Sequence, residues 1–346
     1  MGVRSLDCVT PLWLYALTFV GATTLSLLLV PAVREYAQRK EITDQPGGHK
    51  SHSAPVPYLG GVAMVLAFSA AMFVGVVVRR SSQFDGREVR LTIGNLLAQG
   101  DGLVRELIVV LGLALIFSAM GLIDDLRGLS PWLRFAVGLG IAVTLVAYGI
   151  RLQSPLPDAA DVLLSVVWIL GITNAFNLLD NIDGLAAGTA AVAATTFFLI
   201  ALFNDQDYSA LLAIGLAGAM LGFLRSNFHP ATIYMGDAGS LFIGFLMAYL
   251  GLKMRTTVTE IPQLFAPLMV LGVAVLGILL YLGDYARPLK DAGRALTLWC
   301  ALCLALALRP LIERGRIFGE SYLADAVLPL GQIGVDVAMR LKRRSG

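Results

Sequence analysis

The chain has 346 residues, of which 57% are hydrophobic and 14% are charged, and its mean hydropathy is +0.76. Charged residues make up about a quarter of a soluble globular domain, so this composition excludes such a domain and indicates a membrane protein. The formal net charge of +2 is too small and too dispersed to indicate nucleic-acid binding. The three cysteines include one CxxC but not the second pair that a zinc site needs.

Apolar runs long enough to cross roughly 30 Å of hydrocarbon recur along the chain. The first, residues 11–31, follows a short head with one arginine, as in a signal peptide, but it lacks a clear cleavage site and is long enough to be a retained span. Eight more are predicted at residues 58–78, 106–123, 132–150, 162–179, 185–203, 209–225, 238–252 and 263–283.

Beyond these nine runs, a short tenth covers residues 295–308. The interrupted apolar segment 322–339 forms either an interfacial helix or an irregular further span. The expected fold is therefore all-α: one integral membrane domain over residues 1–346, built as a polytopic bundle of 10 or 11 transmembrane helices.

The polar motifs all fall on one side of the membrane when alternate loops are counted from the first span. They lie in residues 32–57, 124–131, 180–184 and 226–237. Lysine and arginine are almost evenly divided between the two sides, and the excess in the first of these loops over the N-terminal head favours a cytoplasmic position for the motifs. Because an Asp near the bilayer centre costs roughly 2.5–3.5 kcal/mol, repeated carboxylates beside the spans indicate a metal ion, a polar substrate or a water-filled cavity.

The first motif is the loop DQPGGHKSHSAPVPYLGG, residues 44–61. It joins His49, Lys50 and His52 to prolines and glycines that favour an extended chain. Cations that face carboxylates can bind a diphosphate. Taken alone, such a loop is more often simply solvated.

The second motif is the pair Asp124 and Asp125 in GLIDDLRGLSP. Adjacent residues on a helix diverge by about 100°, so one carboxylate can face a metal ion while the other faces a reacting group. That division suits phosphoryl chemistry. For a lone pair of aspartates, the end of a span with Arg127 as a local partner is the simpler interpretation.

The third motif is NAFNLLDNIDGLAAG, residues 174–188. Asn177 and Asp180 share a helix face, whereas Asp183 turns away unless the helix ends near Gly184. So many hydrogen-bonding groups beside apolar spans indicate a broken helix that lines a cavity more than an ordinary polar turn.

The fourth motif is GDAGS, residues 236–240. Asp237 or Ser240 can cap the helix that follows, and such an N-terminus attracts phosphate oxygens. The motif lacks the GK[ST] ending of a Walker A loop, so alone it can be only a cap. Upstream, Asn227 and Tyr234 can present an amide and an aromatic face to a base, or serve as a capping Asn and a core Tyr.

Together these segments resemble the polyprenyl-phosphate N-acetylhexosamine-1-phosphate transferases, in order and spacing, over about residues 44–250. The prolines around Lys50 and His52 resemble the GlcNAc-1-phosphate branch more than the phospho-MurNAc-pentapeptide translocases. The resemblance implies attack by a membrane polyprenyl phosphate on the β-phosphate of a UDP-N-acetylhexosamine, which releases UMP. It also implies a bacterial inner-membrane enzyme of cell-wall, lipopolysaccharide or teichoic acid synthesis, with its site facing the cytoplasm and a homodimer as one assembly it allows.

By motif, the resemblance implies Mg²⁺, with Mn²⁺ as an alternative, held by Asp237 with Asp124 close by. Asp125 is then the base or the group that orients the lipid phosphate. The other implied residues are Lys50 and Asp180 for catalysis, and His52, Asn177, Asp183, Asn227, Tyr234, Gly236 and Ser240 for substrate binding. Among these, Lys50 binds phosphate and Tyr234 stacks on uracil. A metal that bridges the diphosphate neutralises developing charge and improves UMP as a leaving group.

One departure from the family is the lack of its His-rich motif in the last large cytoplasmic loop. The corresponding region, residues 283–294, reads GDYARPLKDAGR, and the resemblance fades from about residue 284 to 346. This keeps two alternatives open: a non-catalytic relative, or a protein that binds or transports polyprenyl phosphate. A secondary transporter is a third, although the chain shows no inverted repeat.

Overall fold

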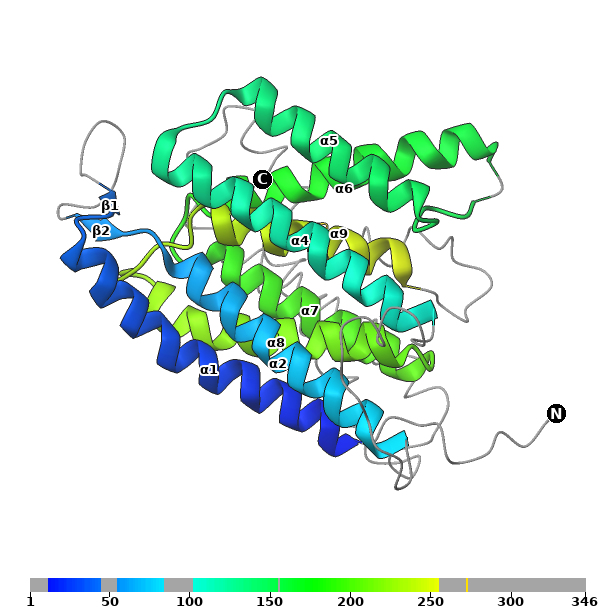
Figure 1. The fold of residues 1–346 in the computed structure, drawn as a ribbon, viewed down its shortest axis with the longest axis horizontal. Helices are drawn as coiled ribbons and strands as arrows, with labels where there is room; N and C mark the ends of the chain where they lie inside the picture. The colour runs from blue at the N-terminus through cyan, green and yellow to red at the C-terminus, as the bar shows by residue number, and fades with distance from the viewer. Residues whose placement is uncertain (1–11, 45–54, 84–101, 155, 255–271, 273–346) are drawn as a thin grey trace, which may run out of the picture. The chain divides into compact units, whose positions relative to one another are not determined.

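A computed structural model describes residues 12–44, 55–83, 102–154, 156–254 and 272 of the chain (Figure 1). All of them belong to Met1–Asp284, the first of two compact units. The second unit, Tyr285–Gly346, lies outside the described residues. The predicted tenth and eleventh spans, the His-free loop and almost all of the predicted span 263–283 therefore also lie outside them.

The described residues form helices, apart from one antiparallel pair of two-residue strands, β1 (Thr43–Asp44) and β2 (Val56–Pro57). The helices are α1 (Leu12–Arg39), α2 (Gly60–Gln83), α4 (Gly102–Arg127), α5 (Pro131–Ala147), α6 (Asp158–Leu179), α7 (Leu185–Phe203), α8 (Asp207–Asn227) and α9 (Asp237–Lys253). Six of them, all but α5 and α9, are long and apolar enough to cross a membrane. The prediction of a helical multi-pass membrane protein is confirmed for this part of the chain.

Helix α1 departs from its predicted bounds, because it continues past residue 31 to Arg39 with Pro31 inside it. A proline removes one backbone hydrogen bond and disturbs the turn before it, which usually ends or kinks a helix. Here the last turns are polar, and Arg39 donates to Glu35 at 2.5 Å across one turn. The end of the apolar run therefore does not mark the end of the helix.

Close packing between α1 and α8 depends on two glycines in α8. A Cβ atom on Gly218 would lie 2.5 Å from the carbonyl oxygen of Phe19, and one on Gly222 would lie 2.6 Å from that of Thr23. Small residues let helix backbones approach closely in membranes, where burial in lipid does not drive helices together. These positions hold α1 against α8.

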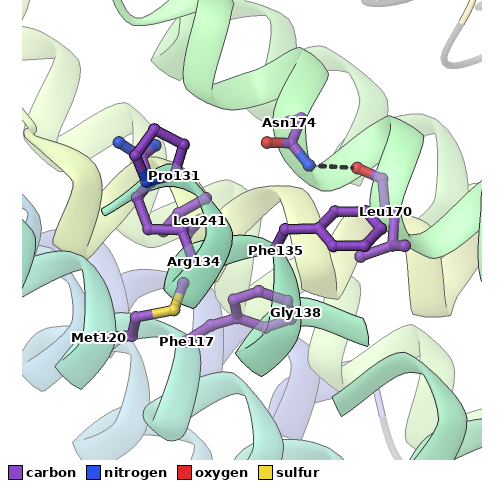
Figure 2. A pocket seen from close by; sticks show the side chains of 9 residues that line it. All are labelled: Phe117, Met120, Pro131, Arg134, Phe135, Gly138, Leu170, Asn174 and Leu241. Carbon is purple, nitrogen blue, oxygen red and sulfur yellow. Dashed lines mark hydrogen bonds between the residues drawn. The ribbon is translucent and has the colours of Figure 1, made fainter. Parts of the chain in front are cut away.

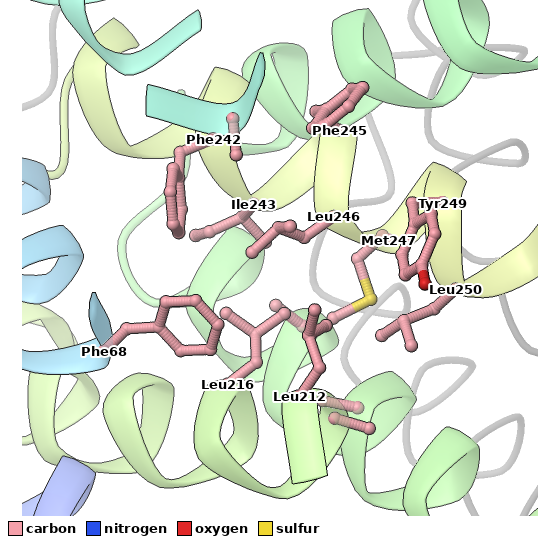
Figure 3. Close-up of a cluster of buried hydrophobic side chains, with 14 of the residues drawn as sticks. Phe68, Leu212, Leu216, Phe242, Ile243, Phe245, Leu246, Met247, Tyr249 and Leu250 are labelled. Atoms are coloured by element: carbon pink, nitrogen blue, oxygen red, sulfur yellow. The ribbon is translucent and has the colours of Figure 1, made fainter. Parts of the chain in front are cut away.

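Helix α9 lies in the middle of the described helices, and its residues from Ala238 to Gly251 are all buried. Figure 3 shows side chains of α9 gathered with Leu212 and Leu216 of α8 and with Phe68 of α2. The rings of Phe68 and Phe242 meet edge to face at 5.6 Å between centroids. Protein therefore surrounds α9, and its first residue, Asp237, is placed among the ends of neighbouring helices.

Helices α4 and α9 run antiparallel. At one end of the pair, the Asp125 carboxylate accepts a hydrogen bond from the backbone N–H of Asp237. At the other end, Glu106 accepts from Lys253. We call the first the acidic end, defined by Asp124, Asp125, Asp180 and Asp237, and the second the paired end.

Candidate active site

The first turn of α9 begins at a sharp bend whose backbone N–H groups are all bound by carboxylates. Gly236 sits there with φ 73°, in a region that favours glycine. Its N–H donates to Asp180 at 3.1 Å, while the N–H groups of Asp237 and Ala238 donate to the two oxygens of Asp125 at 3.0 and 3.2 Å. Two carboxylates from α4 and the end of α6 thus fix the start of α9.

This arrangement corrects the prediction that Asp237 or Ser240 caps the helix. Neither does, because Asp125 reaches across from α4 and takes the first N–H groups. The dipole at a helix N-terminus attracts a carboxylate as well as a phosphate. The anion that this N-terminus holds is therefore a side chain of the protein itself.

Glycines bring three backbones together at the same point. A Cβ atom on Gly121 of α4 would lie 2.3 Å from the carbonyl oxygen of Asp237, and one on Gly61 of α2 would lie 2.4 Å from the backbone nitrogen of Gly239. At Gly236 itself a Cβ atom would lie 2.7 Å from a carboxylate oxygen of Asp125. There is no room for a side chain at these three glycines. The close backbone contacts that they allow bring the carboxylates of α4 to the start of α9.

Arg134, one turn into α5, joins the carboxylates that begin α9 and end α4. Its guanidinium lies 2.6 Å from the Oδ2 atom of Asp124 and 3.2 Å from that of Asp237. Asn177 donates from Nδ2 to Asp237 at 2.6 Å and to Ser240 at 2.9 Å. The structure thus brings together Asp124, Asp237, Asn177 and Ser240, as their shared side of the membrane predicted.

Carboxyl groups outnumber cationic side chains in this network. Within the residues that the structure describes, it contains the four carboxylates of the acidic end and one guanidinium, that of Arg134. Burial raises the pKa of the Asp180 carboxyl well above its usual range, the N–H of Gly236 opposes this, and the nearby carboxylates of Asp237, Asp125 and Asp183 add to it. An excess of carboxylates in a half-buried site favours the binding of an additional cation.

The turn between α6 and α7 breaks the helix as the sequence predicts, but earlier than Gly184. Helix α6 ends at Leu179, and Gly184 with φ 71° begins α7. Asp183 turns to the loop before α9, where it accepts from the N–H of Ala231 at 3.0 Å and lies 2.9 Å from the ring of His229. Asp183 thus tethers the loop that leads to Asp237.

Asn227 is 2% exposed, and its amide bonds to the backbone at both ends. Its oxygen accepts from the N–H of Gly184 at 3.1 Å, and its nitrogen donates to the carbonyl of Ile233 at 3.1 Å. Tyr234 is half-buried, and its backbone bonds to Pro57 and Gly60. In this structure Asn227 therefore holds the loop around the predicted uridine site, the positioning role that the sequence left open.

Two of the predicted site residues, Lys50 and His52, have no described position. Together with His49, they lie outside the described residues. Their expected contacts with phosphate stay predictions.

Arg134 is the site residue that the sequence analysis did not single out. The signal was present, because a lone arginine follows Pro131 in the apolar run PWLRFAVG, where a charge is costly unless it finds a partner. Which partner it finds depends on how α5 packs, and no local pattern records that.

A cavity of about 290 Å³ adjoins the network, between α4, α5, α6 and α9 (Figure 2). Its lining is mostly apolar, with Phe117, Met120 and Leu170 among the residues that form it. Arg134 and Asn174 supply the polar groups of the lining. The arrangement places an apolar space beside a cation and several carboxylates.

The donor set fits Mg²⁺. The described residues contain no group of three or more His, Cys, Asp or Glu side chains placed to share a metal ion. Mg²⁺ in phosphoryl-transfer sites is typically held by one or two carboxylates together with water and substrate phosphates. Asp124 and Asp237, already joined by one cation, match that requirement.

Known proteins are similar to this chain over the region that contains the network. Residues 107–255 match the model of glycosyl transferase family 4. A probable undecaprenyl-phosphate N-acetylglucosaminyl 1-phosphate transferase of Bacillus subtilis is 32% identical over 269 residues, which are 74% of this chain and 68% of that protein. The chain belongs to glycosyl transferase family 4. The matched region contains every acidic residue of the network.

Two further relatives show the range of the family. A decaprenyl-phosphate N-acetylglucosaminephosphotransferase of Mycobacterium leprae is 32% identical and covers 69% of this chain, but the chain spans only 61% of that relative. A phospho-N-acetylmuramoyl-pentapeptide-transferase of Shouchella clausii is 29% identical, over 69% of this chain and 73% of its own. Both branches act on sugar phosphates according to their names, so family membership alone does not choose the donor.

Proposed function

We propose that this family 4 protein transfers N-acetylglucosamine 1-phosphate from UDP-N-acetylglucosamine to a membrane polyprenyl phosphate and releases UMP. The observation that carries the proposal is the acidic network beside an apolar cavity that shares Arg134 with it. A polyprenyl phosphate has one apolar and one anionic part, which suit the cavity and the guanidinium. The names of the Bacillus and Mycobacterium relatives support the choice of sugar.

In the proposed reaction, an oxygen of the lipid phosphate attacks the β-phosphorus of the UDP-sugar. The bond from that phosphorus to the bridging oxygen breaks, and UMP leaves with the electron pair. Asp124 and Asp237 would hold Mg²⁺, which when bound supplies charge neutralisation on the diphosphate. Asn177 orients the Asp237 carboxylate through its 2.6 Å hydrogen bond.

Asp125 is proposed as an orienting group and not as a general base. Both of its oxygens accept backbone N–H groups at the start of α9. A phosphate monoester has its second pKa near 6, so the attacking group is already largely ionised at neutral pH. Positioning and charge neutralisation then matter more than proton removal.

The donor side of the site is proposed to lie along the loop that precedes α9. Asp183 and Asn227 hold this loop through backbone groups of Ala231, Ile233 and Gly184. Tyr234 on the same loop is the proposed stacking partner of uracil. Gly236 and Ser240 shape the turn, and Lys50 with His52 would bind phosphate.

The site is proposed to face the cytoplasm of a bacterial inner membrane, where a UDP-sugar would be available to it. The product would enter the synthesis of a cell-wall or surface polysaccharide, and a homodimer is the proposed assembly. A transporter is disfavoured because Asp124 lies in the last turn of α4 and Asp237 is the first residue of α9, at helix ends and not midway along them.

The direct test is UMP release and lipid-linked product from purified protein with undecaprenyl phosphate, Mg²⁺ and UDP-N-acetylglucosamine. UDP-N-acetylgalactosamine and UDP-MurNAc-pentapeptide serve as competing donors. Turnover with the first donor, lost in Asp237→Asn, is the expected result. Absence of UMP with every donor, while UDP-N-acetylglucosamine still binds in calorimetry, would favour the non-catalytic alternative.

A further inference from the structure

The two carboxylates proposed to hold Mg²⁺ already share a cation, the guanidinium of Arg134. It lies 2.6 Å from Asp124 Oδ2 and 3.2 Å from Asp237 Oδ2. The other oxygen of each carboxylate has a different partner: Asp124 Oδ1 accepts from the N–H of Leu129 at 2.6 Å, and Asp237 Oδ1 accepts from Asn177. An ion that bridges the pair would therefore need the same two oxygens that Arg134 binds.

A divalent ion on these oxygens and the guanidinium are mutually exclusive. Mg²⁺ binds oxygen ligands at about 2.0–2.1 Å, which would place it within a few ångströms of the guanidinium carbon and its nitrogens. Like charges at such a distance repel strongly in a half-buried site. One cation has to leave when the other binds.

The cavity beside the network can receive the Arg134 side chain. Its side chain is about one third exposed and lines the cavity between α4, α5, α6 and α9 (Figure 2). Asn174 lines the same cavity and uses its amide nitrogen on the carbonyl of Leu170, which leaves its oxygen as an acceptor on that wall. A guanidinium released from the carboxylates would stay beside this cavity.

We propose that Arg134 is an internal counterion that occupies the divalent-cation position between Asp124 and Asp237, and that cation binding releases it toward the adjoining cavity. This proposal rests on the proposed function in one respect, the assignment of Asp124 and Asp237 as the residues that would hold Mg²⁺. Without a divalent ion, Arg134 keeps the two carboxylates neutralised and in place. With one bound, its positive charge becomes available to the phosphate of an acceptor whose apolar part fits the cavity.

The first test measures Mn²⁺ affinity of purified full-length protein by electron paramagnetic resonance, without any substrate. Arg134→Gln removes the competing charge, so Mn²⁺ should bind at least about tenfold more tightly than to the natural protein, as expected for close charge pairs. Arg134→Lys keeps the charge and should stay within about threefold of the natural protein. Asp124→Asn should weaken binding.

Arg127→Gln is the matched control, because Arg127 is exposed, lies in the last turn of α4 near Asp124 and has no ion pair among the described residues. It should change Mn²⁺ affinity by less than about threefold. Unchanged or weaker Mn²⁺ binding by Arg134→Gln would overturn the exchange. Equal affinity of Asp124→Asn and the natural protein would overturn it too, because the ion would then bind elsewhere.

A second test follows the side chain itself. Phenylglyoxal modifies accessible guanidinium groups, and mass spectrometry gives the extent at each arginine. Saturating Mg²⁺ should raise modification of Arg134 several-fold and leave Arg127 unchanged. Modification of Arg134 that stays constant or falls with Mg²⁺ would refute its release. Neither test needs turnover, so a failure of the proposed transferase activity would be seen separately.

Discussion

The acidic end and the paired end of the α4 and α9 helix pair treat buried charge differently. Glu106 and Asp124 are separated by about five turns of α4, about 27 Å. At the paired end Glu106 meets Lys253 at 2.6 Å and accepts from the hydroxyl of Tyr249 at 2.8 Å. One carboxylate meets one ammonium group there. At the acidic end the guanidinium of Arg134 pairs with Asp124 and Asp237, while Asp125 and Asp180 accept backbone N–H groups.

A second charge pair at the far end of the bundle follows the same rule as Glu106. Asp207, the first residue of α8, accepts from Arg79 at 2.9 Å and from Tyr15 at 3.1 Å. Asp207 and Asp237 both begin a helix, yet in the part of the chain that the structure describes only Asp237 belongs to a cluster with more carboxyl groups than cations. A cluster with equal numbers of acidic and basic side chains stabilises the fold. A cluster with more acidic than basic side chains is suited to bind an additional cation or a cationic complex.

The largest predicted effect is the difference in kcat between variants of Asp237 and Asp207, the first residues of α9 and α8. Asp237→Asn removes a carboxylate from the acidic end and should lower kcat by more than about 100-fold. Mutation of a residue that only hydrogen-bonds to a metal ligand typically lowers metal affinity or activity by about 10–100-fold, and loss of a ligand should cost more. Asp207→Asn should lower thermal stability and change kcat by less than about threefold. UMP release and thermal unfolding of both variants check this. Equal loss of kcat in both would remove the distinction between the ends.

The second prediction concerns backbone packing at the acidic end. Gly121→Ala would place a Cβ atom 2.3 Å from the carbonyl oxygen of Asp237, so α4 and α9 must separate there. A shift of about 1 Å in a reacting geometry can cost on the order of 10²-fold in rate. Gly112→Ala on the same helix meets nothing within 4 Å and should leave kcat unchanged. Comparable turnover in the two variants would show that close contact at Gly121 is not required.

The third prediction tests Asp125 as a cap. Asp125→Ala leaves the N–H groups of Asp237 and Ala238 without their acceptor, which should cost about 0.5–2 kcal/mol of stability as well as turnover. Asp125→Asn retains one acceptor oxygen and should recover part of the stability. Thermal unfolding of the two variants gives the comparison. A stability equal to that of the natural protein in Asp125→Ala would refute the capping role.

The smallest predicted effect on turnover lies at the paired end. Glu106→Gln leaves Lys253 without its carboxylate and should cost about 1–3 kcal/mol of stability while kcat stays within about threefold. Adding Lys253→Gln should restore part of the loss, because the two changes remove a single pair. Thermal unfolding of the single and double variants measures this coupling. Additive losses would mean that the pair contributes nothing beyond its separate side chains.

The sequence alone determined the membrane class and an apolar run in each described helix, and it placed the acidic motifs together on one side of the spans. Hydropathy reports these because every membrane span must be apolar and must satisfy its own backbone. A predicted span overlaps each of the eight described helices. The third motif predicted the break between α6 and α7, but α6 ends at Leu179, before Asp180 and earlier than the expected end near Gly184. Hydropathy misjudged the end of α1, because the polar turns after Pro31 lie outside the apolar run but remain helical.

Only the tertiary structure decided which partner each polar group finds. Asp125 caps a helix 112 residues away, and Asn227 ties Gly184 to Ile233. Arg134 joins Asp124 to Asp237 because α5 packs beside the end of α4. Charge, size and hydropathy are local properties that a sequence displays directly. Hydrogen-bond partners depend on how helices far apart in the chain approach one another, and here glycine contacts of a few ångströms set that approach.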